Sequence, residues 1–169
     1  MKGTWITSNV TYGFINVYDP NDPTRRKTLW SNLESVIGSD DNLRCVVFAD
    51  FNIVKSVDEK IGSIFRSSIA YYINKLIAST GLIDLPIGGQ KFTYMSSDCS
   101  KHSKVDRFLI SHNCSTDWPH LIVTALPRLH SDHCPLILSS FVSDFVALPF
   151  RFFNSWLLED ELEGVVKQG

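Results

Sequence analysis

The stretch Cys45-Val46-Val47-Phe48-Ala49-Asp50-Phe51-Asn52 joins an apolar run to two polar side chains, an aspartate and an asparagine. A short apolar run rich in β-branched and aromatic residues predicts a buried strand. Two further apolar runs also have polar residues at one end: Asp106 precedes Phe108-Leu109-Ile110, and His133 precedes Pro135-Leu136-Ile137-Leu138. Because a rigid sheet can bring the ends of distant strands together at one rim, we expect these polar side chains to meet there.

Composition and charge place few limits on the partner of this chain. It has 169 residues, of which 44% are hydrophobic, and a formal net charge of −2 at pH 7. This is the composition of one globular domain with a sizeable core. The net charge neither supports nor excludes a nucleic acid, which would have to meet a local basic patch. No apolar run approaches the roughly 18 residues needed to span a membrane, so no membrane contact is expected.

The cysteines carry no clear pairing signal. No N-terminal stretch joins a basic segment to an apolar core, as a signal peptide would, so reduced thiols in an intracellular protein are expected. Four possible zinc ligands fall within a short span, but their spacing does not match the usual zinc pairs and a zinc site is not favoured. These four residues are Cys99, His102, His112 and Cys114.

Hydrophobic periodicity predicts strands that alternate with helices. The expected strands are residues 12–18, 42–49, 92–95, 104–111, 120–126 and 135–141. The expected helices are residues 28–37, ending at Gly38, and 67–79, ending near Gly81. Residues 55–65 are expected to form an irregular loop, Gly88-Gly89 a turn, and residues 96–103 a hairpin loop. Strands interleaved with helices, followed by hairpins, predict an α/β layered fold with a mixed sheet.

Four motifs, in this order along the chain, resemble those of the endonuclease/exonuclease/phosphatase superfamily. They are Asn16-Val17-Tyr18-Asp19-Pro20, Ala49-Asp50-Phe51-Asn52, Ser103-Lys104-Val105-Asp106 and Ser131-Asp132-His133. The sequence between them, including Gly88-Gly89-Gln90-Lys91-Phe92-Thr93-Tyr94, is similar to the endonuclease domain of plant LINE-type (non-LTR) retrotransposons. The resemblance implies a two-sheet α/β sandwich of the DNase I-like type, Mg²⁺ as cofactor and DNA as partner.

The same resemblance implies roles for individual residues. Asp50 and Asn52 would orient and activate the attacking water. Asp106 would hydrogen-bond His133, and protonated His133 would offset the charge that grows on the phosphate in the transition state. The remaining assignments are a phosphate-contacting tyrosine (Tyr18), an aspartate near the metal (Asp132), and phosphate or DNA contacts at Thr93 and Ser131.

One expected element has no counterpart in the sequence. The resemblance implies that a glutamate in an early strand is the principal Mg²⁺ ligand, and residues 1–17 contain no acid. We therefore expect a fold that lacks its first strands and first helix, with residues 1–145 forming a partial domain. Residues 146–169 would begin a linker toward a missing reverse transcriptase region. A hard cation prefers several oxygen ligands, so the loss should weaken Mg²⁺ binding.

Two functional hypotheses follow. The first is a DNA-nicking phosphodiesterase, impaired by the missing glutamate and nuclear if it is functional. The second is a non-catalytic retrotransposon-derived remnant or interaction module. Within the enzyme class, a phosphatase of the same superfamily is less favoured because the intervening sequence resembles that of retrotransposons.

Each motif taken alone also has a purely structural explanation. Asp50-Phe51-Asn52 could be a strand end that enters an Asx turn, and Asp106-Arg107 could be a local ion pair. His133 could be a buried histidine bonded to backbone. Arg25-Arg26-Lys27 could contact a DNA backbone, although three basic residues in a turn are more often a solvated surface. The order of the motifs, rather than any single motif, favours a shared site.

Overall fold

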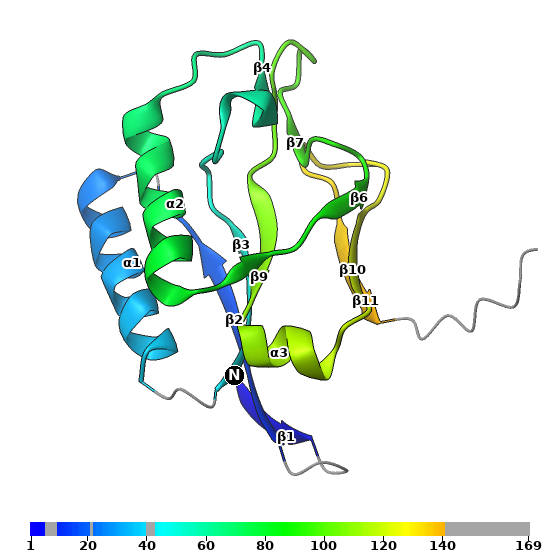
Figure 1. Ribbon diagram of the computed structural model, residues 1–169. Helices are drawn as coiled ribbons and strands as arrows, with labels where there is room; N and C mark the ends of the chain where they lie inside the picture. Colours follow the sequence, from blue (N-terminus) through cyan, green and yellow to red (C-terminus); the bar gives the residue numbers. More distant parts are fainter. Residues whose placement is uncertain (6–9, 21, 40–42, 141–169) are drawn as a thin grey trace, which may run out of the picture.

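The computed structural model describes residues 1–5, 10–20, 22–39 and 43–140, and Figure 1 shows their arrangement. In this part of the chain, a five-stranded sheet has the order β1-β2-β3-β9-β5, and two three-stranded sheets have the orders β11-β10-β6 and β4-β8-β7. The strands of the five-stranded sheet are β1 (Lys2–Trp5), β2 (Val10–Tyr18), β3 (Arg44–Asp50), β9 (Asp106–Ile110) and β5 (Ile83–Asp84). The other strands are β6 (Ile87–Gly89), β10 (Leu121–Ala125), β11 (Leu136–Ser140), β4 (Lys60–Ile61), β7 (Tyr94–Met95) and β8 (His102–Ser103).

Strand β3 is the centre of the large sheet. It pairs in parallel with β2 and antiparallel with β9, so both of its edges are hydrogen-bonded. Its residues Cys45 and Val47 are fully buried beneath the helices, and Val46 is buried on the opposite face. Burial of both faces explains why this strand is a continuous apolar run rather than an alternating one.

Helix α1 (Pro23–Ile37) begins five residues earlier than the periodicity predicts. Asp22 is the N-cap and its carboxylate accepts a hydrogen bond from the Arg25 amide at 2.8 Å. Pro23 occupies the first turn, where the missing N–H costs nothing. The helix therefore begins at its cap and proline signal, and the expected start at Thr28 was wrong.

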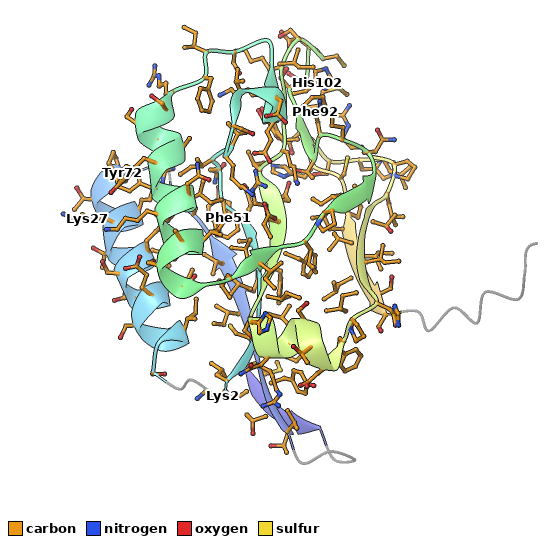
Figure 2. All side chains as sticks on the ribbon, in the orientation of Figure 1. Lys2, Lys27, Phe51, Tyr72, Phe92 and His102 are labelled. Carbon is orange, nitrogen blue, oxygen red and sulfur yellow. The ribbon has the colours of Figure 1, made fainter. Side chains whose placement is uncertain are left out.

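Helix α2 (Ser67–Thr80) confirms the predicted amphipathic segment. Its residues Ala70, Ile73 and Leu76 are buried at helical spacing, and Gly81 ends the helix in the left-handed conformation with φ of 64°. Helices α1 and α2 cover the same face of the large sheet (Figure 1). Phe51, which is labelled in Figure 2, packs in the core between these helices and the sheet.

The β11-β10-β6 sheet packs against the opposite face. Val46 and Ile110 of the large sheet share a buried cluster with Val123 of β10, and Leu136 packs against it. The rings of Phe48 and Phe108 stack on this side with their centroids 5.7 Å apart. The molecule is thus layered as helices, sheet and second sheet, which confirms the predicted two-sheet α/β sandwich.

Other local predictions were wrong. The expected turn at Gly88-Gly89 lies in β6, which pairs in parallel with β10, and Gly89 has φ of 81° with its Cα beside the carbonyl of Ala125. The expected loop 55–65 contains a 3₁₀ turn, η1 (Val57–Glu59), and β4. Helix α3 (His112–Asp117) was not predicted, because its sequence lacks apolar periodicity, and β1 was not predicted either.

Two expectations concern the ends of the molecule and the membrane. The predicted linker at residues 146–169 lies outside the described residues. None of the described helices is long and apolar enough to cross a membrane.

Candidate active site

Three strand ends form one row across the large sheet. Tyr18 at the end of β2 is in register with Asp50 at the end of β3, and Asp50 is in register with Asp106 at the start of β9. Residues in register on neighbouring strands point to the same face of a sheet. The two aspartates are half-buried, whereas the Tyr18 side chain is exposed. The predicted convergence of Tyr18, Asp50 and Asp106 at one rim is what the structure shows.

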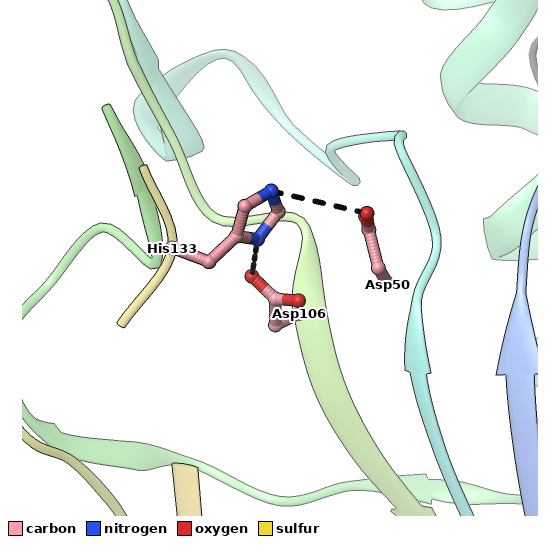
Figure 3. Close-up of side chains that lie close together, drawn as sticks. All are labelled: Asp50, Asp106 and His133. Atoms are coloured by element: carbon pink, nitrogen blue, oxygen red, sulfur yellow. Dashed lines mark hydrogen bonds and ion pairs between the residues drawn. The ribbon is translucent and has the colours of Figure 1, made fainter. Parts of the chain in front are cut away.

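His133 reaches this row from the loop before β11. Its Nδ1 atom lies 2.8 Å from Oδ2 of Asp106, and its Nε2 atom lies 3.9 Å from Oδ2 of Asp50 (Figure 3). A bridge between the backbones of Tyr94 and His133 holds the loop, and the two rings meet edge to face at 5.3 Å. The imidazole therefore stands between two carboxylates with one nitrogen bonded and the other turned toward Asp50.

Asn52 lies beside the cluster in a constrained conformation. Its φ of 52° is in the left-handed region, which asparagine tolerates better than most residues. Its backbone N–H donates to Oδ1 of Asp50 at 2.9 Å, as in an Asx turn, and its Nδ2 donates to the carbonyl of Asp19 at 2.8 Å. The Asx turn that was considered as a purely structural reason for Asp50-Phe51-Asn52 is therefore present. It holds Asn52 next to Asp50.

Thr93 supports the site from the interior. It is fully buried, and its hydroxyl oxygen accepts hydrogen bonds from the N–H groups of Val105 at 3.1 Å and Asp106 at 3.0 Å. Its carbonyl accepts a hydrogen bond from the N–H of Cys134 at 2.7 Å. Thr93 thereby ties Asp106 to the residue that follows His133, and a contact with phosphate remains a prediction.

Ser131 and Asp132 lie in the exposed loop that carries His133. The Ser131 hydroxyl accepts a hydrogen bond from the His133 N–H at 3.1 Å, and the Asp132 carbonyl accepts one from the Met95 N–H at 2.9 Å. Ser131 therefore shapes the loop from within, and Asp132 ties the loop to β7. The metal role of Asp132 and the DNA role of Ser131 remain predictions.

The charges of the cluster shift the protonation of its members. Burial raises the pKa of Asp50 above its ordinary value, and the Asp106 charge adds to this, although the hydrogen bond from the Asn52 N–H acts in the opposite direction. Burial lowers the pKa of His133, but the hydrogen bond and charge of Asp106, together with the charges of Asp50 and Asp132, outweigh it. The net pKa of His133 is raised. The site thus favours a protonated imidazole beside a carboxylate that holds its proton more readily than usual.

The cluster can also hold a divalent metal ion. Asp50, Asp106 and His133 each offer one ligand atom within 4.8 Å of the others, and they form the one such group among the described residues. Two carboxylates suit a hard cation that completes its coordination with water and substrate oxygens. No glutamate belongs to this group, and the zinc alternative at Cys99, His102, His112 and Cys114 does not appear among the described residues as a cluster.

A groove lies beside the cluster. It has a volume of about 530 Å³, and Asn52 and Tyr94 line it at the site. Lys60, Arg66 and the exposed Ile64 line it farther away. A groove with two cations and one aromatic ring next to two carboxylates can hold an anionic chain whose bases stack on apolar groups.

The residues that sequence reasoning missed are buried charges behind the site. Arg107, adjacent to Asp106, is fully buried and forms ion pairs with Glu59 and Asp84 rather than with Asp106. Asp19 is also fully buried, and it binds Arg26 and Trp30 of α1. Strand alternation places Arg107 on the helix face, opposite to Asp106, which was the available signal for its burial.

Two solved nucleases have a similar fold. A 3'-5' exonuclease (NExo) from Neisseria Meningitidis matches with a TM-score of 0.59 and 19% identity, over 78% of this chain and 61% of that chain. The AP endonuclease LMAP from Leishmania major matches with a TM-score of 0.62 and 12% identity, over 78% of this chain and 50% of that chain. No family model and no curated protein matches the chain.

These two likenesses establish the fold. The chain has the DNase I-like α/β sandwich that the sequence predicts. It spans 61% and 50% of the length of the two nucleases.

Proposed function

We propose that the chain hydrolyses phosphodiester bonds in DNA with the help of a divalent metal. The observation that carries the proposal is the His133 imidazole, which bonds Asp106 at 2.8 Å and faces Asp50 at 3.9 Å on the rim of a DNase I-like sheet. The two nucleases with this fold support a substrate of the same kind. Mg²⁺ is the expected ion because the cluster offers carboxylate oxygens.

Each residue of the cluster has a chemical task in this proposal. Asp50 takes the proton of the attacking water as the water oxygen bonds phosphorus and the bond to the leaving sugar oxygen breaks. His133, protonated and held in one orientation by Asp106, donates a hydrogen bond to a phosphate oxygen as negative charge grows there. The oxygens of Asp50 and Asp106 would hold the ion, which when bound supplies positive charge near the scissile phosphate. Asn52 fixes the geometry of the water.

The groove beside the site is the proposed path of the DNA strand. Lys60 and Arg66 would meet phosphates and Tyr94 would meet a base or sugar next to the reacting bond. The basic run Arg25-Arg26-Lys27 does not support this role as a unit, because the Arg26 guanidinium is committed to the buried Asp19 carboxylate at 2.6 Å.

We further propose that the chain is of the LINE-type retrotransposon kind and that its activity is low. The motifs and the sequence between them support the first point. The low activity is supported by the composition of the candidate metal site. Within the described part of the chain, this site consists of two aspartates and a histidine and includes no glutamate. Few oxygen ligands give weak metal affinity, so turnover should need a high Mg²⁺ concentration. The alternative is a module that binds DNA without cutting it.

The test is conversion of supercoiled plasmid to the nicked form by the purified chain over a series of Mg²⁺ concentrations. The proposal expects slow nicking that rises with Mg²⁺ and stops on addition of a chelator. Retarded migration of DNA on a gel without nicking at any Mg²⁺ concentration would support the binding module instead.

A further inference from the structure

Asp19 is a buried carboxylate that the proposed chemistry does not use. It follows the last residue of β2, is fully buried, and lies on the side of the sheet that α1 covers. Its Oδ1 atom accepts a hydrogen bond from Nε1 of Trp30 at 2.9 Å, and its Oδ2 atom lies 2.6 Å from Nε of Arg26. Arg26 and Trp30 are four residues apart on α1, so one helical face holds the carboxylate.

The backbone of Asp19 holds the loop that follows β3. Its N–H donates to the carbonyl of Asp50 at 2.9 Å, and its carbonyl accepts a hydrogen bond from Nδ2 of Asn52 at 2.8 Å. One residue therefore connects helix α1 through its side chain to Asp50 and Asn52 through its backbone. Movement of Asp19 would displace both residues together.

These contacts determine which end of the Asn52 amide faces the cluster. Because Nδ2 donates to a carbonyl oxygen, the amide cannot be reversed without placing two acceptors together. The backbone of Asn52 is in the left-handed region, and its N–H is already bonded to Asp50. Among the described residues, no donor is bonded to Oδ1 of Asn52, so this oxygen remains available as an acceptor.

We infer that Asp19 is a positioning residue that fixes Asn52, so that its Oδ1 atom is presented as an acceptor to the attacking water or to a bound cation. The inference rests on the proposed function and deepens it, because it names the Asn52 atom that acts and the residue that holds it in place. A buried carboxylate needs charged and hydrogen-bonding partners to remain in place. Arg26 and Trp30 supply these partners from α1.

The test compares Asp19→Asn with two other variants. Asp19→Asn keeps the size of the side chain and a partner for Trp30 but leaves Arg26 without its counter-ion. Trp30→Phe removes the indole donor and retains an aromatic ring in the core, so it serves if Asp19→Asn does not fold. Leu33→Ala is the matched control, because Leu33 is buried in the same helix and core but its side chain cannot form a hydrogen bond or ion pair with the Asp19 carboxylate.

Two measurements are made on each variant. The first is the kcat for plasmid nicking, including the double variant Asp19→Asn with Asn52→Ala. We expect Asp19→Asn to lower kcat by roughly 10- to 100-fold through misplacement of Asn52, and to have little further effect once Asn52 is absent. The second is the NMR signal of the Asn52 side-chain amide, assigned by its loss in Asn52→Ala. It should shift in Asp19→Asn and Trp30→Phe and remain in place in Leu33→Ala.

Each outcome decides the inference. The inference is overturned if Asp19→Asn and Trp30→Phe leave both the kcat and the Asn52 amide signal unchanged. It is also overturned if Leu33→Ala lowers kcat as much as Asp19→Asn does. An undiminished effect of Asp19→Asn in the Asn52→Ala background would also overturn it. If the wild-type chain does not nick DNA at all, the proposed function fails, and the Asn52 amide signal alone decides whether Asp19 positions Asn52.

Discussion

Nδ1 of His133 lies 2.8 Å from Oδ2 of Asp106, although the two residues are separated by 27 positions in the chain. Strand β9 supplies the aspartate and the loop before β11 supplies the imidazole. Thr93 joins the two segments, because its hydroxyl accepts from the Asp106 N–H and its carbonyl accepts from the Cys134 N–H. The pair fixes the orientation of the ring, and this orientation leaves Nε2 facing Asp50.

The first prediction concerns the protonation of His133. In chelator-treated protein, its pKa measured by NMR should lie above the ordinary value of 6.5, because Asp106 stabilises the charged ring. Asp106→Asn should lower this pKa, since the variant removes the charge. Ser131→Ala removes only hydrogen bonds within the loop, to the His133 N–H and the Asp132 carboxylate, and keeps the charge of Asp106, so it should leave this pKa raised. A His133 pKa at or below 6.5 in the wild-type protein would contradict the prediction.

The same shift predicts how stability depends on pH. A pKa that is higher in the folded than in the unfolded state stabilises the fold fully below the unfolded value, and this contribution is lost as pH rises through the folded value. The stability difference between wild type and Asp106→Asn, measured by urea unfolding, should therefore shrink as pH rises through the pKa of His133. A difference that grows with pH over that range would be inconsistent with a stabilising pair.

The second prediction concerns Thr93. Thr93→Val preserves the shape of the side chain but leaves the buried N–H groups of Val105 and Asp106 without an acceptor. We expect a loss of about 1–3 kcal/mol in the free energy of unfolding, measured with denaturant. Thr93→Ser keeps the hydroxyl and should lose less. Equal stability of Thr93→Val and wild type would show that other groups or water satisfy these donors.

The third prediction concerns the buried charges around Arg107. Glu59→Ala should cost about 3–5 kcal/mol, because it removes a partner of a guanidinium that has no access to solvent. Arg107→Met should cost less, since Lys55 lies 2.7 Å from Asp84 and Lys104 lies 3.9 Å from Glu59, so both acids retain a cation. Thermal and urea unfolding of the two variants give the comparison. A larger loss of stability in Arg107→Met than in Glu59→Ala would show that the network depends on Arg107 more than on Glu59.

The row of strand ends could be predicted from the sequence. Asp50 directly follows a continuous apolar run and Asp106 lies two residues before another, and strands with both faces covered have such runs. His133 lies shortly before a third apolar run, and this position predicted it as the third residue of the cluster. The order of the motifs along the chain made the fold predictable as well. Short-range signals of this kind fix where a strand ends but not which strands are neighbours.

The buried charges behind the site could not be predicted, and one error explains part of this. Hydrophobic periodicity predicted that α1 begins at Thr28, which leaves Arg26 outside the helix. Only a helix that begins at Pro23 brings Arg26 and Trp30 to the same side as Asp19. The partners of Arg107 lie 48 and 23 residues away, and no local pattern indicates such a pairing.

The measurement that tests the central claim most directly is the initial rate of DNA nicking at saturating Mg²⁺ for wild type, Asp50→Asn, His133→Gln and Asp117→Asn. Asp117 pairs with Arg44 at the other end of β3, so its variant controls for general destabilisation. We predict a slow but measurable wild-type rate that survives in Asp117→Asn. In Asp50→Asn and His133→Gln it should fall by about 100-fold or more, which corresponds to a loss of roughly 2.7 kcal/mol or more of transition-state stabilisation. Nicking that persists undiminished in Asp50→Asn and His133→Gln would contradict the assignment of the reaction to this cluster.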